Sequence, residues 1–135
     1  GRSRVALPGG AELVIHPRME QSAYGEMLAG HDVGLALMFT PHPSLVPLEM
    51  ASAGLLTVTN TYDTKTAADL EALSGNLIAA EPTIEGVVDG LAEAVGRVGD
   101  GSSRAAGATV EWSTDWEDSF SDPLIAEING LLDRC

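Results

Sequence analysis

The sequence predicts one α/β domain, built on an open parallel sheet with helices on both faces, followed by a C-terminal helical segment. Short apolar runs alternate with segments of helical spacing, and glycine or proline lies between them. The apolar runs lack alternating polar residues, which is typical of parallel strands covered on both faces. Strand and helix follow one another at the spacing of right-handed βαβ units.

Four segments are predicted to be strands: the apolar runs 13–15, 33–39 and 77–80, and residues 55–59, which are rich in residues that favour strands. The second run is the longest and contains no polar side chain. We therefore expect its last residues, Met38 and Phe39, to belong to the core.

Capping residues mark the predicted helices. Ser22 precedes a segment with Tyr24 and His31 on one face, and Thr66 begins a Thr-x-x-Asp capping box that Gly75 ends. Thr83 precedes the clearest helical pattern, whose apolar residues are Ile84, Val87, Val88, Leu91, Val95 and Val98.

The last two dozen residues form a separate unit, so we divide the chain into a lobe at 1–111 and a docking helix at 112–135. Asp122 and Pro123 read as an N-cap and a first helical residue. An apolar stripe follows, and aromatic residues precede it at four-residue spacing: Leu124, Ile125, Ile128, Leu131 and Leu132, after Trp112, Trp116 and Phe120. Seven acids lie between Glu111 and Asp133, and we read them as a solvated face.

Composition excludes several classes of protein. With 135 residues, 44% of them hydrophobic and 20% charged, the chain is long enough for a core and is not generally disordered. A net charge of −13 excludes a nucleic-acid or anionic-membrane binder held by a basic face. No run reaches the ~18 apolar residues of a membrane span. Cys135 is the one cysteine, so no disulfide within the chain is possible. We read the chain as a piece of a longer, cytoplasmic protein, with a peripheral position at the inner membrane face as an alternative.

The segment after the second predicted strand carries the strongest functional signal. Pro41, Pro43 and Pro47 make a stiff loop, and Pro47 fits only the first turn of a helix. The helix is therefore expected to begin at Ser44, its candidate cap, and to end at Gly54. This places a helix N-terminus at the carboxyl end of a central parallel strand, where open α/β sheets bind ligands and where free N–H groups suit a phosphate.

Each candidate residue has two interpretations. Glu49, one turn into the helix, either accepts hydrogen bonds from vicinal hydroxyls of a ligand or is simply exposed. His42 is a ligand contact or a loop histidine with a local hydrogen bond, and Ser44 is a ligand contact or only a cap. Lys65, the one lysine of the chain, reaches a phosphate at the same sheet edge or lies on the surface.

Three stretches resemble a known family: Tyr24-Gly-Glu-Met-Leu-Ala-Gly-His-Asp-Val-Gly-Leu-Ala-Leu-Met, the block Pro-His-Pro-Ser-Leu-Val-Pro-Leu-Glu-Met-Ala-Ser-Ala-Gly ending at Gly54, and Thr-Val-Thr-Asn ending at Asn60. The pattern is similar to the Rossmann-like C-terminal lobe of GT-B glycosyltransferases. More narrowly, it resembles bacterial dTDP-rhamnose-dependent rhamnosyltransferases of surface polysaccharide and S-layer glycan synthesis. The resemblance covers about residues 13–95.

The resemblance implies a two-lobed enzyme with a nucleotide-diphosphate sugar in the cleft and no metal or other cofactor. Glu49 matches the glutamate that binds sugar-ring hydroxyls, usually those of the nucleotide pentose. The backbone N–H groups of Ser44 and Leu45 match positions that face the pyrophosphate, and His42 and Pro43 fall where the loop meets the donor. Many retaining GT-B enzymes carry a second glutamate eight positions before the first, where this chain has Pro41.

The expected function is thus the donor-binding lobe of a glycosyltransferase, with a glycan acceptor and an N-terminal lobe of the same protein as partners. Lys65 is the candidate cation for the leaving diphosphate. The alternative is a non-catalytic Rossmann-like interaction module in a glycan-assembly protein, suggested by the acidic, tryptophan-bearing tail. A receiver-like or flavodoxin-like domain needs a cluster of acids at strand ends, which Asp32 alone does not supply.

Overall fold

The computed structural model describes residues 3–113 and 115–134, and Cys135 and the side chain of Trp116 lie outside the described part. The chain forms a mixed α/β fold of the Rossmann-like type. Its elements, in chain order, are β1 (Arg4–Ala6), the short 3-10 helix η1 (Pro8–Gly10), β2 (Glu12–Val14), α1 (Gln21–Ala29), β3 (Val33–Leu35), α2 (Leu45–Ser52), β4 (Leu56–Asn60), α3 (Ala67–Leu73), β5 (Leu77–Ala80), α4 (Ile84–Arg97), α5 (Gly101–Gly107), α6 (Trp116–Ser119) and α7 (Asp122–Leu132).

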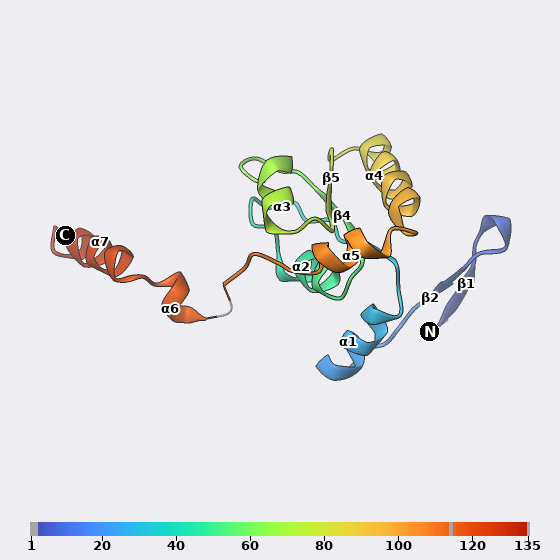
Figure 1. The fold of residues 1–135 in the computed structure, drawn as a ribbon, viewed down its shortest axis with the longest axis horizontal. Coiled ribbons are helices and arrows are strands. Elements are labelled where there is room, and N and C mark those ends of the chain that lie inside the picture. Colours follow the sequence, from blue (N-terminus) through green and yellow to red (C-terminus); the bar gives the residue numbers. More distant parts are fainter. Residues whose placement is uncertain (1–2, 114, 135) are drawn as a thin grey trace.

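The central sheet is parallel, in the order β3-β4-β5. Helices α2 and α3, which connect these strands, pack on one face, and α4 packs on the other (Figure 1). Covering on both faces explains why β5 is continuously apolar and why Thr57 and Thr59 of β4 are fully buried together with its apolar residues. The predicted sheet and helix arrangement is therefore confirmed for residues 33–98.

Two separate cores lie against the two faces. Leu56, Val58 and Ile78 pack against α4, together with Ala80 and Ala94. On the opposite face Leu77 packs with Leu48, Ala51 and Leu70 from α2 and α3. Alternate residues of one strand thus serve different helices, as the strand period of two requires. Gly90 allows α4 to approach the sheet closely, because a Cβ there would lie 3.0 Å from a methyl carbon of Val58.

The first predicted strand, 13–15, was assigned to the wrong kind of sheet. Residues 12–14 form β2, which pairs antiparallel with β1 in an exposed hairpin. Gly9 and Gly10 both adopt positive φ, 77° and 84°, and reverse the chain between the two strands. Glycine adopts this backbone region without steric cost, so the Gly-Gly pair was the overlooked hairpin signal.

The second predicted strand is shorter than expected. β3 stops at Leu35, and the last ladder bond runs from the Ala36 N–H to the Val58 carbonyl (3.0 Å). The remainder of the apolar run leaves the sheet, and Met38 and Phe39 are 39% and 77% exposed, so their assignment to the core was wrong.

The helix signals have mixed outcomes. Thr66 makes the predicted capping box, and the Thr83 hydroxyl accepts the Gly86 N–H. α1 begins one residue before Ser22, with Glu20 at its N-cap, so Ser22 is not the cap. Ser44 occupies the N-cap of α2, but its side chain makes no capping hydrogen bond.

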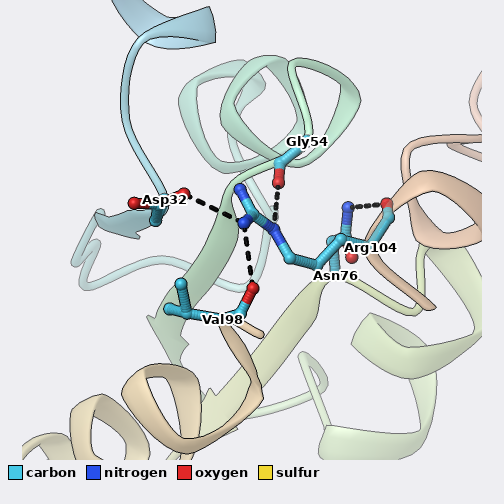
Figure 2. A network of polar contacts seen from close by, with 5 residues as sticks. All are labelled: Asp32, Gly54, Asn76, Val98 and Arg104. Carbon is cyan, nitrogen blue, oxygen red and sulfur yellow. Dashed lines mark hydrogen bonds and ion pairs between the residues drawn. The ribbon is translucent and has the colours of Figure 1, made fainter. Parts of the chain in front are cut away.

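A polar network ties the amino ends of the strands together (Figure 2). The Arg104 side chain of α5 donates to the carbonyls of Gly54 (3.2 Å) and Val98 (3.1 Å) and forms an ion pair with Asp32 (2.9 Å). The buried Asn76 amide donates in turn to the Arg104 carbonyl (2.9 Å). This edge of the sheet is therefore fixed by groups from five separate segments.

The C-terminal segment extends away from the sheet (Figure 1). The chain is still attached at residues 111 and 112: the Glu111 N–H donates to the Leu73 carbonyl (2.8 Å), and the Trp112 ring contacts His42. α7 begins with Asp122, after Ser121 as its N-cap, one residue earlier than the sequence predicted. All side chains described between 115 and 134 are exposed, apart from the position of Gly130, which is half-buried.

Candidate functional site

The candidate site lies at the carboxyl ends of the parallel strands. The loop 36–44 leaves β3 there and leads into α2. Parallel strands present their carboxyl ends at one edge, so residues that follow β4 meet this loop at the same place. Asn60 and Lys65 are the residues that do so.

Ser44 has an unusual backbone conformation directly before α2. Its φ of 71° and ψ of 157° lie in a region that residues other than glycine rarely occupy. The Ser44 N–H donates to Nδ1 of His42 (2.9 Å), which holds the turn. Because Nδ1 accepts this bond, a neutral His42 ring carries its proton on Nε2.

The turn leaves the first amides of α2 available. Leu45 and Val46 are the first two helical residues, whose N–H groups have no partner inside a helix, and Pro47 has no N–H. A hollow of about 250 Å³ lies in front of this turn, lined by Leu35, Ala36, Leu37, Met38, Ser44, Val46 and Pro47. The front of α2 is thus open, and its exposed donors and dipole favour an anion.

Trp112 contacts the loop and was not among the predicted site residues. Its ring lies edge-on to the His42 ring, with centroids 5.6 Å apart at 88°. No feature near residue 112 in the sequence points to His42, since the two positions are 70 residues apart. The contact joins the start of the C-terminal segment to the loop at the candidate site.

Glu49 lies one turn beyond the open amides, on the exposed side of α2. It does not line the 250 Å³ hollow. Its negative charge acts on Tyr24 of α1, whose pKa is raised first by burial and second by this charge. Pro43 is half-buried in the loop, and Leu45 is 56% exposed.

Lys65 is buried, which rules out the surface role that was one of its two interpretations. Only 3% of the residue is exposed, and its Nζ donates to the Met38 carbonyl (3.2 Å). Among the described residues no carboxylate lies within ion-pair distance of it. Burial accordingly lowers the pKa of the Lys65 ammonium. The structure places this cation behind the loop, beneath its middle.

Asn60 is the residue that most directly positions the loop, and sequence reasoning missed it. Its Oδ1 accepts the Met38 N–H (2.8 Å) and its Nδ2 donates to the Met38 carbonyl (3.1 Å). With these two hydrogen bonds, the Asn60 side chain pairs with the Met38 backbone as a neighbouring strand would. It does so beyond the point where the backbone pairing of β3 and β4 ends. An asparagine at the end of a predicted strand was the available signal.

A second, larger hollow lies on the α4 side of the same loop. It has a volume of about 520 Å³ and is lined mostly by apolar side chains, those of Leu37, Met38, Phe39, Pro82, Ile84, Val87 and Val88, together with Asn60 and Thr83. The loop therefore separates two open spaces, and its apolar side chains line both. We call this second space the α4 groove.

In the segments 3–113 and 115–134, histidine, cysteine and acidic side chains nowhere gather in a group of three that could hold a metal ion. Over the same segments, no helix combines the length and the apolar character needed to span a bilayer.

Comparison with known proteins identifies the class of protein. Residues 1–92 match the model of the family described as WsaF, C-terminal domain, so the chain belongs to that family. This is a glycosyltransferase-associated domain of glycan biosynthesis.

One curated relative supports the same assignment. The chain is 48% identical over 64 residues to the O-antigen biosynthesis protein RfbC of Myxococcus xanthus. The match covers 47% of this chain but 5% of that protein, so the domain corresponds to a small part of its relative.

Proposed function

We propose that this domain is the donor-binding lobe of a GT-B glycosyltransferase, which transfers rhamnose from a nucleotide diphosphate to a glycan acceptor in the cytoplasm. The observation that carries the proposal is the strained Ser44 turn, which opens the first amides of α2 at the carboxyl edge of the sheet. Strained backbone of this kind persists where the surrounding structure enforces it, commonly at ligand sites. Membership of a glycosyltransferase-associated family supports the choice of ligand.

The diphosphate would bind in front of α2. The N–H groups of Leu45 and Val46 would donate to its oxygens, and each such bond to a charged group contributes about 1.5–3 kcal/mol. His42 and Pro43 would border the ligand, and Ser44 sets the direction of the amides. No metal is required in this arrangement, because amides and the helix dipole stabilise the leaving group.

Lys65 would contribute at longer range. Its ammonium is buried without a carboxylate, so a diphosphate near the loop would supply the missing opposite charge. Glu49, on the exposed side of α2, would accept hydrogen bonds from the pentose hydroxyls once the preceding lobe closes the cleft. The isolated chain should bind donor weakly and show no transfer, since catalysis in a two-lobed enzyme needs both lobes.

Calorimetric titration of the domain with dTDP and dTDP-rhamnose tests the proposal. Leu45→Pro is the sharpest variant, because proline is tolerated at the first helical position and removes one N–H without disturbing the helix. We expect it to weaken dTDP binding at least about tenfold, the equivalent of ~1.4 kcal/mol, whereas Leu45→Ala, which keeps the N–H, should not.

Glu49→Gln provides a second arm, with the exposed Glu71→Gln of α3 as its control. The first should weaken donor binding by the full-length enzyme about tenfold through the hydroxyl contacts. The proposal fails if neither dTDP nor dTDP-rhamnose binds below about 1 mM and Glu49→Gln leaves the full-length enzyme unchanged. That result would favour the non-catalytic interaction module.

A further inference from the structure

Trp112 reaches the candidate site from outside the loop that forms it. His42 lies in this loop, where its carbonyl accepts the Thr40 hydroxyl (3.1 Å) and its Nδ1 accepts the Ser44 N–H (2.9 Å). Both of these partners belong to the loop itself. Of the hydrogen bonds and ring contacts that His42 makes within the described part of the chain, only the perpendicular contact with the Trp112 ring comes from another segment. Trp112 is thus the side chain through which the rest of the domain fixes the imidazole.

The segment that carries Trp112 is anchored to the core of the domain. Val110 packs against the cluster that contains Leu48 of α2, and the Glu111 N–H donates to the Leu73 carbonyl of α3 (2.8 Å). The Trp112 N–H then donates to the Val110 carbonyl (2.9 Å), which closes a three-residue turn. Trp112 and the body of α2 are therefore fixed to the same frame, and the indole gives the loop a firm support.

The turn at Ser44 needs such a support. Its φ of 71° and ψ of 157° carry a steric cost for residues other than glycine, and this conformation persists only where surrounding contacts enforce it. The bond from the Ser44 N–H to His42 is exposed and lies within the loop, so it holds the turn only while the imidazole is itself held. The perpendicular ring contact with Trp112 is attractive and restrains the imidazole. The three residues thus form a chain of contacts that ends at the first N–H groups of α2.

We propose that Trp112 is a positioning residue of the donor site: it holds the Ser44 turn through the His42 ring and thereby aims the first amides of α2 at the diphosphate. The consequence for binding rests on the proposed function, whereas the support of the turn does not. The role is indirect, because Trp112 does not line the hollow in front of α2. It is also local: a residue that merely stabilised the whole domain would affect helix starts on both faces of the sheet.

Hydrogen–deuterium exchange of the full-length protein, resolved to single amides by electron-transfer fragmentation, tests the support of the turn without a ligand. Trp112→Leu keeps an apolar side chain but removes the aromatic contact, and we expect it to speed exchange of the Ser44 N–H about fivefold. The Gly86 N–H is the matched control, because it also bonds to a side chain at the start of a helix, the Thr83 hydroxyl (3.0 Å). Its exchange should change less than about twofold. Trp112→Phe, which keeps an aromatic ring, should restore slow exchange at Ser44.

Titration of the same full-length variants with dTDP tests the consequence for binding. Trp112→Leu should weaken dTDP binding about fivefold, and Trp112→Phe should stay within about twofold of the wild type. The Ser44→Gly background gives the sharper readout, because glycine adopts the turn without strain. In that background Trp112→Leu should weaken binding by less than about twofold. A direct contact between Trp112 and the ligand would instead produce the same loss in both backgrounds.

Three results would overturn the proposal: unchanged exchange at Ser44 in Trp112→Leu, equal acceleration at Ser44 and Gly86, or an equal loss of dTDP affinity with and without Ser44→Gly. The exchange measurement also separates failure of this inference from failure of the proposed function. A wild-type protein that binds no dTDP would refute the donor site, and exchange at Ser44 would still decide whether Trp112 holds the turn. Binding of dTDP that Trp112→Leu leaves unchanged would refute the positioning role alone.

Discussion

The two edges of the parallel sheet carry similar polar side chains, but these side chains make different kinds of contact. At the amino edge, Asn76 and Arg104 direct their donors to internal carbonyls and an adjacent acid. At the carboxyl edge, Asn60 also holds a backbone segment, but the neighbouring Lys65 has a single carbonyl as its partner. At the amino edge, the polar groups bond to other groups of the domain and hold the fold together. The carboxyl edge leaves the first amides of α2 open, with a buried cation behind the loop that has no carboxylate partner among the described residues.

This contrast predicts that variants at the amino edge change stability, and that variants at the carboxyl edge change binding or move stability the opposite way. The expected effects follow from the largest to the smallest.

Asn76→Ala should have the largest effect on stability. The fully buried amide donates to the carbonyls of Ala51 (3.2 Å) and Arg104 (2.9 Å), and both lose a partner in the variant. We expect the free energy of unfolding to fall by about 3 kcal/mol, measured by urea denaturation. The exposed Glu71→Ala should change it by less than about 0.5 kcal/mol. A loss for Asn76→Ala as small as that of Glu71→Ala would contradict a structural role for this edge.

Arg104→Ala should cost about 2 kcal/mol, because its guanidinium is largely buried and holds two carbonyls. Asp32→Asn removes the same ion pair from the other side but should cost less than about 1 kcal/mol, since the Asp32 side chain is 63% exposed and the pair is screened. Thermal or urea unfolding of both variants separates the two contributions. Equal losses would mean that the ion pair, and not the carbonyl contacts, is the stabilising element.

Ser44→Gly should stabilise the domain by about 1 kcal/mol, because glycine adopts the Ser44 backbone conformation without strain. Ser52→Gly, near the end of the same helix, should instead destabilise by about 0.5 kcal/mol, since helical glycine carries an entropic cost. Urea denaturation of the two variants gives the comparison. Destabilisation by Ser44→Gly would refute a strained turn at the candidate site.

Lys65→Met should produce the smallest effect, one that is visible in its dependence on pH. Burial lowers the pKa of Lys65 in the folded protein below its ordinary value of 10.5. Between this lowered pKa and 10.5, the unfolded chain therefore binds more protons than the folded chain. The wild type should gain stability relative to Lys65→Met as the pH rises through that window toward 10.5. Unfolding free energies measured at several pH values test this, and Lys65→Arg, charged throughout, should show no such gain.

The layered part of the fold was predictable because its signals are local. A segment rich in strand-favouring residues marked β4, an apolar run marked β5, and Thr66 and Thr83 marked the starts of α3 and α4. The N-terminal hairpin was not predicted. The short apolar run at 13–15 was interpreted as a strand of the parallel sheet, and the Gly9-Gly10 pair before it was not recognised as a turn.

The details of the candidate site were harder to predict, because they depend on contacts between distant segments. The position of Ser44 at the start of α2 followed from the prolines, but its strained backbone is held by the hydrogen bond that its N–H donates to Nδ1 of His42. The burial of Lys65 and the pairing of Asn60 with Met38 join residues 22 to 27 positions apart. No local pattern encodes such contacts.

The Asn60–Met38 pairing has a consequence for engineering. The loop is held by the end of β4 as well as by β3. Residues 36–44 would therefore not keep their conformation if they were transferred alone. A chimaera that grafts this loop onto a related scaffold would have to import Asn60 and Lys65 with it, or the grafted turn would lose its anchor.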